Sequence, residues 1–96
     1  MAPLYSGTLS RNAFFGWKAG AVNISGNFNS FFGRNAGQAN TTGNENAFFG
    51  GCAGINNTIG SRNAFFGAML AVRTRTGANN TAVGRGSDVN LDRVRS

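Results

Sequence analysis

The amino-acid sequence predicts an all-β fold: a β-solenoid, or parallel β-roll, of about five coils of 17 residues with two short strands per coil. A five-residue motif recurs at one fixed interval and begins at Asn12, Asn29, Asn46, Asn63 and Asn80. Four copies read Asn-(Ala or Ser)-Phe-Phe-Gly, and the fifth reads Asn-Thr-Ala-Val-Gly. A solenoid requires such a constant interval because its backbone must return to the same place after every coil.

Each residue of the array can be given a slot from 1 to 17, with the motif asparagine in slot 1. The array is predicted over residues 11–90, preceded by a leader or start segment at 1–10 and followed by a basic tail or junction at 91–96. No unit shows the apolar spacing of 3.6 that marks an amphipathic helix. Frequent glycines also oppose a helix, since each costs on the order of 1 kcal/mol in a helix interior.

The first strand of each coil is predicted over slots 1–5, where alternating side chains end at a glycine. A second strand is predicted over segments such as 19–24 and 36–41. Two corners separate these strands, and a turn with positive φ at each corner explains the recurrent glycines. The corner glycines occupy slot 5 (Gly16, Gly33, Gly50, Gly67 and Gly84) and slot 15 (Gly26, Gly43, Gly60 and Gly77).

Strand side chains alternate between two faces, so the two phenylalanines of a motif must point in opposite directions. We expect slots 2 and 4 to fill the coil interior, because a small residue beside a large one suits a narrow space. The predicted interior residues are Ala13, Phe15, Ser30, Phe32, Ala47, Phe49, Ala64, Phe66, Thr81 and Val83.

Slot 3 is then expected to face outward as a column of rings spaced about 4.8 Å apart. Such a column exposes more apolar surface than a soluble monomer usually does, which predicts that another chain covers it. The predicted interface between chains therefore consists of Phe14, Phe31, Phe48, Phe65 and Ala82.

The polar residues of slots 1 and 12 are predicted to stack at the corners. Slot 12 holds Asn23, Asn40, Asn57 and Thr74. Their side-chain amides can hydrogen-bond to the turn backbone and to the equivalent residues of neighbouring coils, as in stacked asparagine ladders.

The segment Asn46-Ala-Phe-Phe-Gly-Gly-Cys-Ala-Gly-Ile-Asn-Asn-Thr-Ile-Gly60, together with Asn80-Thr-Ala-Val-Gly84, resembles the repeats of left-handed parallel β-rolls in trimeric autotransporter adhesin heads. Similar arrays occur in phage and bacterial tail-fibre proteins. The resemblance implies a homotrimer that is extracellular, on a cell surface or in a virion tail fibre, and that acts as a rigid spacer and adhesive surface. No secretory signal peptide is visible in this sequence.

The composition argues against an enzyme. The sequence has no histidine, its only acids are Glu45, Asp88 and Asp92, and its one cysteine, Cys52, has no imidazole to activate it. No cluster of metal ligands is present, so we expect no cofactor, no metal and no small-molecule substrate. No apolar run reaches the roughly 20 residues that cross a bilayer, which predicts no membrane insertion.

The net charge of +6 raises the question of nucleic-acid binding. A groove that follows phosphates along an array should carry a cation in every repeat, yet no lysine or arginine falls inside a five-residue motif. Nucleic acid is therefore a disfavoured partner. The alternative function is a carbohydrate- or receptor-binding module that contacts a host glycan or protein through turn residues that vary from unit to unit, with Trp17, Lys18 and Arg34 as the possible ligand contacts. The variable turn residues are Trp17, Lys18, Phe28, Arg34, Glu45 and Arg62.

Overall fold

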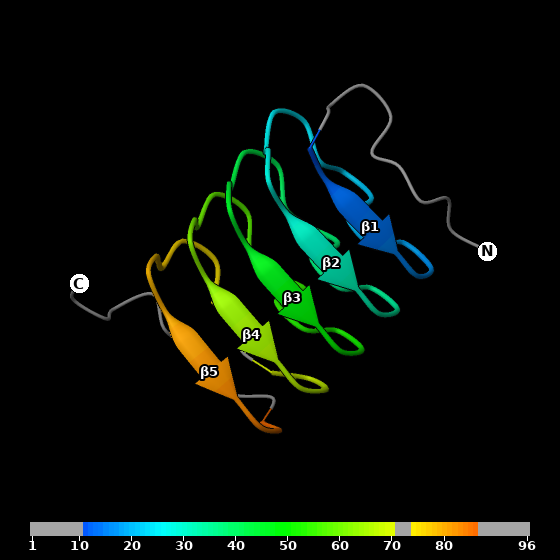
Figure 1. Cartoon of the computed structure of the whole chain (residues 1–96), viewed down its shortest axis with the longest axis vertical. Coiled ribbons are helices and arrows are strands. Elements are labelled where there is room, and N and C mark those ends of the chain that lie inside the picture. The colour runs from blue at the N-terminus through cyan, green and yellow to red at the C-terminus, as the bar shows by residue number, and fades with distance from the viewer. Residues whose placement is uncertain (1–10, 71–73, 87–96) are drawn as a thin grey trace.

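The computed structural model describes residues 11–70 and 74–86. They form an all-β parallel solenoid of about four turns without a helix. Figure 1 shows five short strands stacked side by side, one per coil. They are β1 (Ala13–Phe15), β2 (Ser30–Phe32), β3 (Ala47–Phe49), β4 (Ala64–Phe66) and β5 (Thr81–Val83). The predicted fold class is confirmed, while the predicted leader (1–10) and tail (91–96) lie outside the described residues.

The strands form one parallel sheet in chain order, β1-β2-β3-β4-β5. Every strand residue pairs with the residue of the same slot in the next coil, so Phe14 pairs with Phe31 and Phe31 with Phe48. The constant interval of 17 residues sets this register, because any insertion would displace all later pairs. The strands lie across the broad face of a flat body measuring 32 × 22 × 15 Å (Figure 1).

Each coil contains one strand, limited to slots 2–4, and not the two that the sequence predicted. The predicted second strand is replaced by tight turns, in which the Ala36 N–H donates to the Gly33 carbonyl at 3.1 Å and the Asn40 N–H to the Gly37 carbonyl at 3.1 Å. Gly37, inside the segment predicted as a strand, has a φ of 59°, which an extended strand cannot accommodate. Neighbouring coils still pair along this side through backbone hydrogen bonds.

The two glycine corners differ from each other. Slot-5 glycines have positive φ, as predicted, but Gly26, Gly43 and Gly60 in slot 15 do not, so the predicted turn conformation is wrong for them. Their glycine is required by close packing between coils, since a Cβ on Gly43 would lie 2.3 Å from the Gly60 carbonyl oxygen. The left-handed conformation at this end of the coil falls instead on slot 17, occupied by Arg11, Phe28, Glu45, Arg62 and Asn79.

The interior of the coils is built around the slot-3 phenylalanines. Phe31, Phe48 and Phe65 are completely buried, and their rings stack at centroid distances of 4.9 Å. The prediction that slot 4 fills the interior is wrong: Phe15 is 39% exposed, Phe66 41% and Val83 77%. Phe32, Phe49 and the slot-2 residues also lie on the outer face. The residues that were predicted to fill the interior and lie on the outer face instead are Ala13, Phe15, Ser30, Phe32, Ala47, Phe49, Ala64, Phe66, Thr81 and Val83.

The space for the inward ring comes from small residues across the coil. Slot 8 supplies Ala36, which is completely buried, and slot 9 supplies Gly37, where an added Cβ would lie 2.5 Å from the Phe31 ring. The same arrangement recurs in the coils of Phe14 and Phe48. A large side chain in slot 3 thus fits inside because its small partner lies six residues later in the chain, not in the neighbouring slot.

Slots 1 and 12 form the predicted asparagine ladders, and this prediction is confirmed. In slot 1, Asn46 donates its side-chain amide to the Gly60 carbonyl at 2.8 Å, and its backbone N–H donates to Asn29 Oδ1 at 2.9 Å. In slot 12, Asn57 Nδ2 donates to Asn40 Oδ1 at 3.0 Å. Burial of most of these amide atoms is tolerated because neighbouring coils supply their partners. Asn57 Oδ1 and Asn80 Nδ2, toward the last described coil, are the two buried ladder atoms without one.

Candidate functional site

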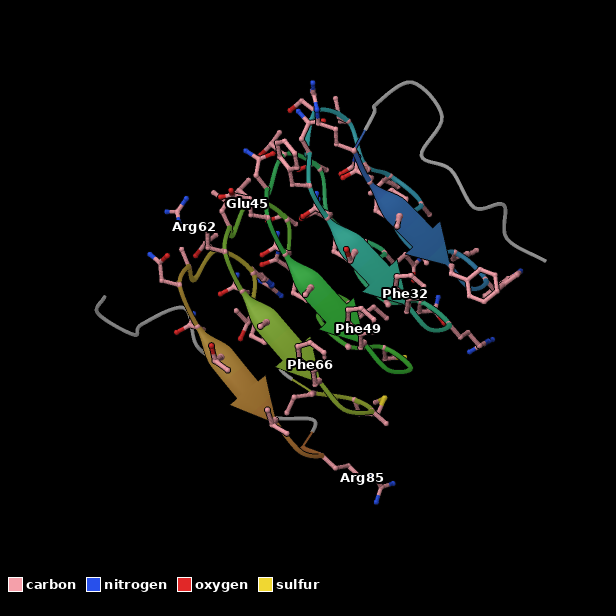
Figure 2. The ribbon with its side chains drawn as sticks, viewed as in Figure 1. Phe32, Glu45, Phe49, Arg62, Phe66 and Arg85 are labelled. Carbon is pink, nitrogen blue, oxygen red and sulfur yellow. The ribbon has the colours of Figure 1, made fainter. Side chains whose placement is uncertain are left out.

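The most distinctive surface is the outer face of the sheet, which we call the Phe face. It consists of slots 2 and 4 on β1 to β5 and contains no charged residue. Slot 4 forms a column of large side chains, and slot 2 forms a parallel column of small ones. Figure 2 shows Phe32, Phe49 and Phe66 in a row at the carboxyl ends of their strands.

The aromatic column is regular. The Phe32 and Phe49 rings stack at 4.9 Å with planes 7° apart, and the Phe49 and Phe66 rings at 5.0 Å with planes 3° apart. At the first coil the Phe15 ring is tilted by 51° and lies 6.0 Å from Phe32. Stacking on both sides half-buries the central rings, while the outer side of the column stays open to solvent.

The structure therefore corrects the predicted interface between chains. Slot 3 cannot contact another chain, because Phe14, Phe31, Phe48 and Phe65 are buried inside the coils and Ala82 packs against that core. An outward column of aromatic rings exists, as the sequence argument required, but slot 4 provides it. The ring that faces inward and the ring that faces outward were exchanged in the prediction.

The three possible ligand contacts lie together at the corner after the strands. Lys18 Nζ lies 4.6 Å from the centre of the Trp17 ring, and Arg34 Cζ lies 4.8 Å from it. Trp17 is 53% exposed. Because Trp17 and Arg34 occupy slot 6 of adjacent coils, stacking of the coils brings them side by side. This Trp17 corner combines an accessible aromatic ring with two positive charges.

At the opposite end of the strands, slot 17 forms a column. The sequence identified Phe28, Glu45 and Arg62 as variable turn residues but did not predict their contacts along this column. Arg11 lies over the Phe28 ring at 5.5 Å, Glu45 pairs with Arg62 at 3.9 Å, and Arg62 Nε donates to Asn79 Oδ1 at 2.7 Å. Figure 2 shows Glu45 and Arg62 projecting from this end, away from the labelled phenylalanines. An exposed ion pair of this kind contributes little to stability. Opposite charges 17 residues apart were the available sequence signal.

Other features are modest. An open groove of about 300 Å³ runs along the turn side of the coils and is lined by Val22, Gln38, Ala39, Ile55 and Asn56. Among the described residues, no group of three histidine, cysteine or acidic side chains could hold a metal ion. The same part of the chain contains no helix that could span a membrane. Cys52 is a free, partly buried thiol.

Comparisons with protein-family models, with curated proteins and with solved structures find no match for this chain.

Proposed function

We propose that this chain is a structural, non-enzymatic segment of a fibre: a rigid spacer that associates with copies of itself through the Phe face. The exposed, uncharged column of stacked phenylalanines is the observation that carries this proposal. Contiguous apolar surface of this kind is typical of protein interaction sites. The resemblance of the repeats to adhesin heads and tail fibres supports an extracellular, cell-surface or virion location and, by itself, a trimer.

Rigidity is supported by hydrogen bonds between coils on every side of the solenoid. Beyond the strands, the Gly50 N–H donates to the Phe32 carbonyl at 2.8 Å and the Cys52 N–H to the Arg34 carbonyl at 2.8 Å. On the turn side, the Gly37 N–H donates to the Ala53 carbonyl at 3.0 Å. Bending one coil against the next would break several of these bonds together with the interior ring stacks. Each added coil should therefore extend the rod without adding a hinge.

Sedimentation equilibrium tests the self-association. We expect a mass above the 10.0 kDa of one chain at micromolar concentration. Phe49→Asp should shift the mass toward that of the monomer, because it places a charge in the middle of the Phe face. Ile59→Asp is the matched control: Ile59 is 55% exposed, lies outside the face, and receives the same charge. A single-chain mass at all concentrations would contradict the proposal.

A second candidate function is recognition of an acidic glycan at the Trp17 corner. The observation that favours it is the convergence of Lys18 and Arg34 on the Trp17 ring, since guanidinium and ammonium groups bind carboxylates through charge-assisted hydrogen bonds. Trp17 is the only tryptophan, so its fluorescence reports directly on this corner. Titration with sialyllactose should give a saturable change that neutral lactose does not, and Arg34→Gln should weaken it roughly tenfold. Equal responses to both sugars would reject this function.

A further inference from the structure

We infer that the Phe face joins two copies of the chain about a two-fold axis parallel to the solenoid axis, so that the coils of both copies run in the same direction and lie level with each other. The inference rests on the proposed self-association and goes beyond it by fixing the number and orientation of the chains. The partner is a second copy because the face is complementary to itself under this one operation.

The complementarity comes from the two columns of the face. Slot 2 is small (Ala13, Ser30, Ala47, Ala64 and Thr81), and slot 4 is large up to the fourth coil. A rotation by half a turn about an axis along the stack exchanges the two ends of every strand. It therefore places slot 4 of one copy over slot 2 of the other, coil by coil. Packed sheets lie about 10 Å apart, a separation that one ring over one small side chain can fill.

Other arrangements fit the face less well. A two-fold axis along the strands would oppose slot 4 with slot 4 and slot 2 with slot 2. Rings would then meet rings while a gap remained above Ala47 and Ala64, and such voids forfeit packing energy. A three-fold axis cannot bring flat faces together across their width, because each face would meet its two neighbours only along its edges. Alternation of large and small columns thus favours a pair over the trimer that the resemblance implies.

Charge and area support a second copy as the occupant. The chain carries a net charge of +6, yet the Phe face has no charged residue, so two copies can approach there without placing cations in the centre of the contact. The broad face of the body measures 32 by 22 Å. Coverage of this whole face, with the corners on either side of the Phe face included, would bury at most about 700 Å² of each copy, or about 1,400 Å² in all, which lies within the range of specific protein interfaces.

The level alignment of the two copies follows from the limited length of the ring column. Sliding one copy by one coil would again place rings over small residues, but it would leave the end coil of each copy uncovered. Phe15 of one copy and Val83 of the other, which lie on the end coils and are 39% and 77% exposed, would lose their cover. The level pair therefore buries the most apolar surface.

Analytical ultracentrifugation of the full chain tests the number of chains. We expect twice the monomer mass, a monomer for Phe49→Asp, and twice the monomer mass for Ile59→Asp. Three times the monomer mass would overturn the two-fold pair while leaving self-association intact. A monomer at all concentrations would overturn both. Circular dichroism of each variant establishes that the coils are folded.

Exchange of the two columns in one coil tests which slots face each other. Ala47→Phe should weaken the pair roughly tenfold, because the new ring would meet Phe49 of the partner subunit. Ala47→Phe combined with Phe49→Ala should restore the affinity, since a ring again opposes a small residue. If slot 2 faced slot 2, Ala47→Phe would fill the gap and tighten the pair, and that result would overturn the inference.

Cross-linking tests the direction of the coils. In a Cys52→Ser background, Ala13→Cys places one thiol per chain on the first coil. A bifunctional thiol reagent that matches the about 10 Å separation of packed sheets should join two such chains. It should not join an Ala13→Cys chain to a Thr81→Cys chain, because four coil steps of about 4.8 Å separate those positions along the axis. The opposite pattern would show antiparallel copies and overturn the inference.

Discussion

Replacing the two phenylalanines of one motif separately gives a sharp test of which ring lies inside the coil. Phe48 is completely buried and stacks on Phe31 and Phe65 at 4.9 Å. Phe48→Ala should lower the free energy of unfolding by about 3–5 kcal/mol, the usual cost of emptying a core phenylalanine site. The free energy of unfolding of a whole domain is roughly 5–15 kcal/mol, so this variant should be close to unfolding.

Phe49→Ala should cost much less. Removal of the Phe49 ring breaks two ring contacts at the surface, those with Phe32 and Phe66. Each such pair contributes roughly 0.5–1.5 kcal/mol to the free energy of unfolding. The two contacts together give a loss of about 1–3 kcal/mol in the monomer, below the cost of emptying the completely buried Phe48 site. Urea unfolding followed by circular dichroism measures both variants. It should be repeated at several protein concentrations, because association of folded chains adds apparent stability. A cost for Phe49→Ala that equals or exceeds that of Phe48→Ala in dilute solution would refute the reasoning.

Three further substitutions test the interior by the same unfolding assay. Gly37→Ala should destabilise by about 2 kcal/mol or more, since its φ is +59° and the new Cβ would meet the Phe31 ring, whereas the control Gly51→Ala meets no atom and should be neutral. Similar losses for both would contradict the packing described. Asn40→Ala should cost about 2–4 kcal/mol, because the completely buried amide of Asn40 bonds to both neighbouring ladder residues; a cost below 1 kcal/mol would argue against the ladder. Thr74→Asn should add roughly 1 kcal/mol by giving a donor to Asn57 Oδ1, which is buried without a partner, and a net loss would mean that the ladder cannot be extended.

The sequence was sufficient to predict the stack of coils and its register. A repeat without insertions leaves one way to pair each coil with the next, and the observed partners of Phe31 and Phe48 are their slot equivalents. The asparagine ladders were also predictable. Regular spacing identified Asn40 and Asn57 as neighbours, and an amide in such a column can both donate to and accept from its equivalents.

The choice of inward face could not be made from alternation alone, because a phenylalanine column stands on each side of the strand. Slot 1 shares its face with slot 3, and a polar asparagine there argues for the outside unless its hydrogen bonds are known. In the structure the coils satisfy the Asn46 amide internally, so slots 1 and 3 both face inward. The recurrent Ala36-Gly37 pair was the sequence signal for this arrangement, since it leaves room for a ring across the coil.

The turns were the least predictable part of the coils. Left-handed backbone occurs at Lys18, Cys52 and Glu45, residue types that do not favour it. Their conformation follows from pairing with the adjacent coils, as the Cys52 N–H bond to the Arg34 carbonyl illustrates. The Trp17 corner, by contrast, follows from slot positions alone, because stacking places slot 6 of one coil beside slot 6 of the next.

Nuclear Overhauser spectroscopy of the labelled chain tests the central claim most directly. The account predicts that the Phe48 ring contacts the rings of Phe31 and Phe65, and that the Phe31 and Phe48 rings contact the Ala36-Gly37 and Ala53-Gly54 pairs of their own coils. The Phe32 and Phe49 rings should contact each other but none of these small residues. Contacts from Phe32 and Phe49 to Ala36 and Ala53, with none from Phe31 and Phe48, would contradict it.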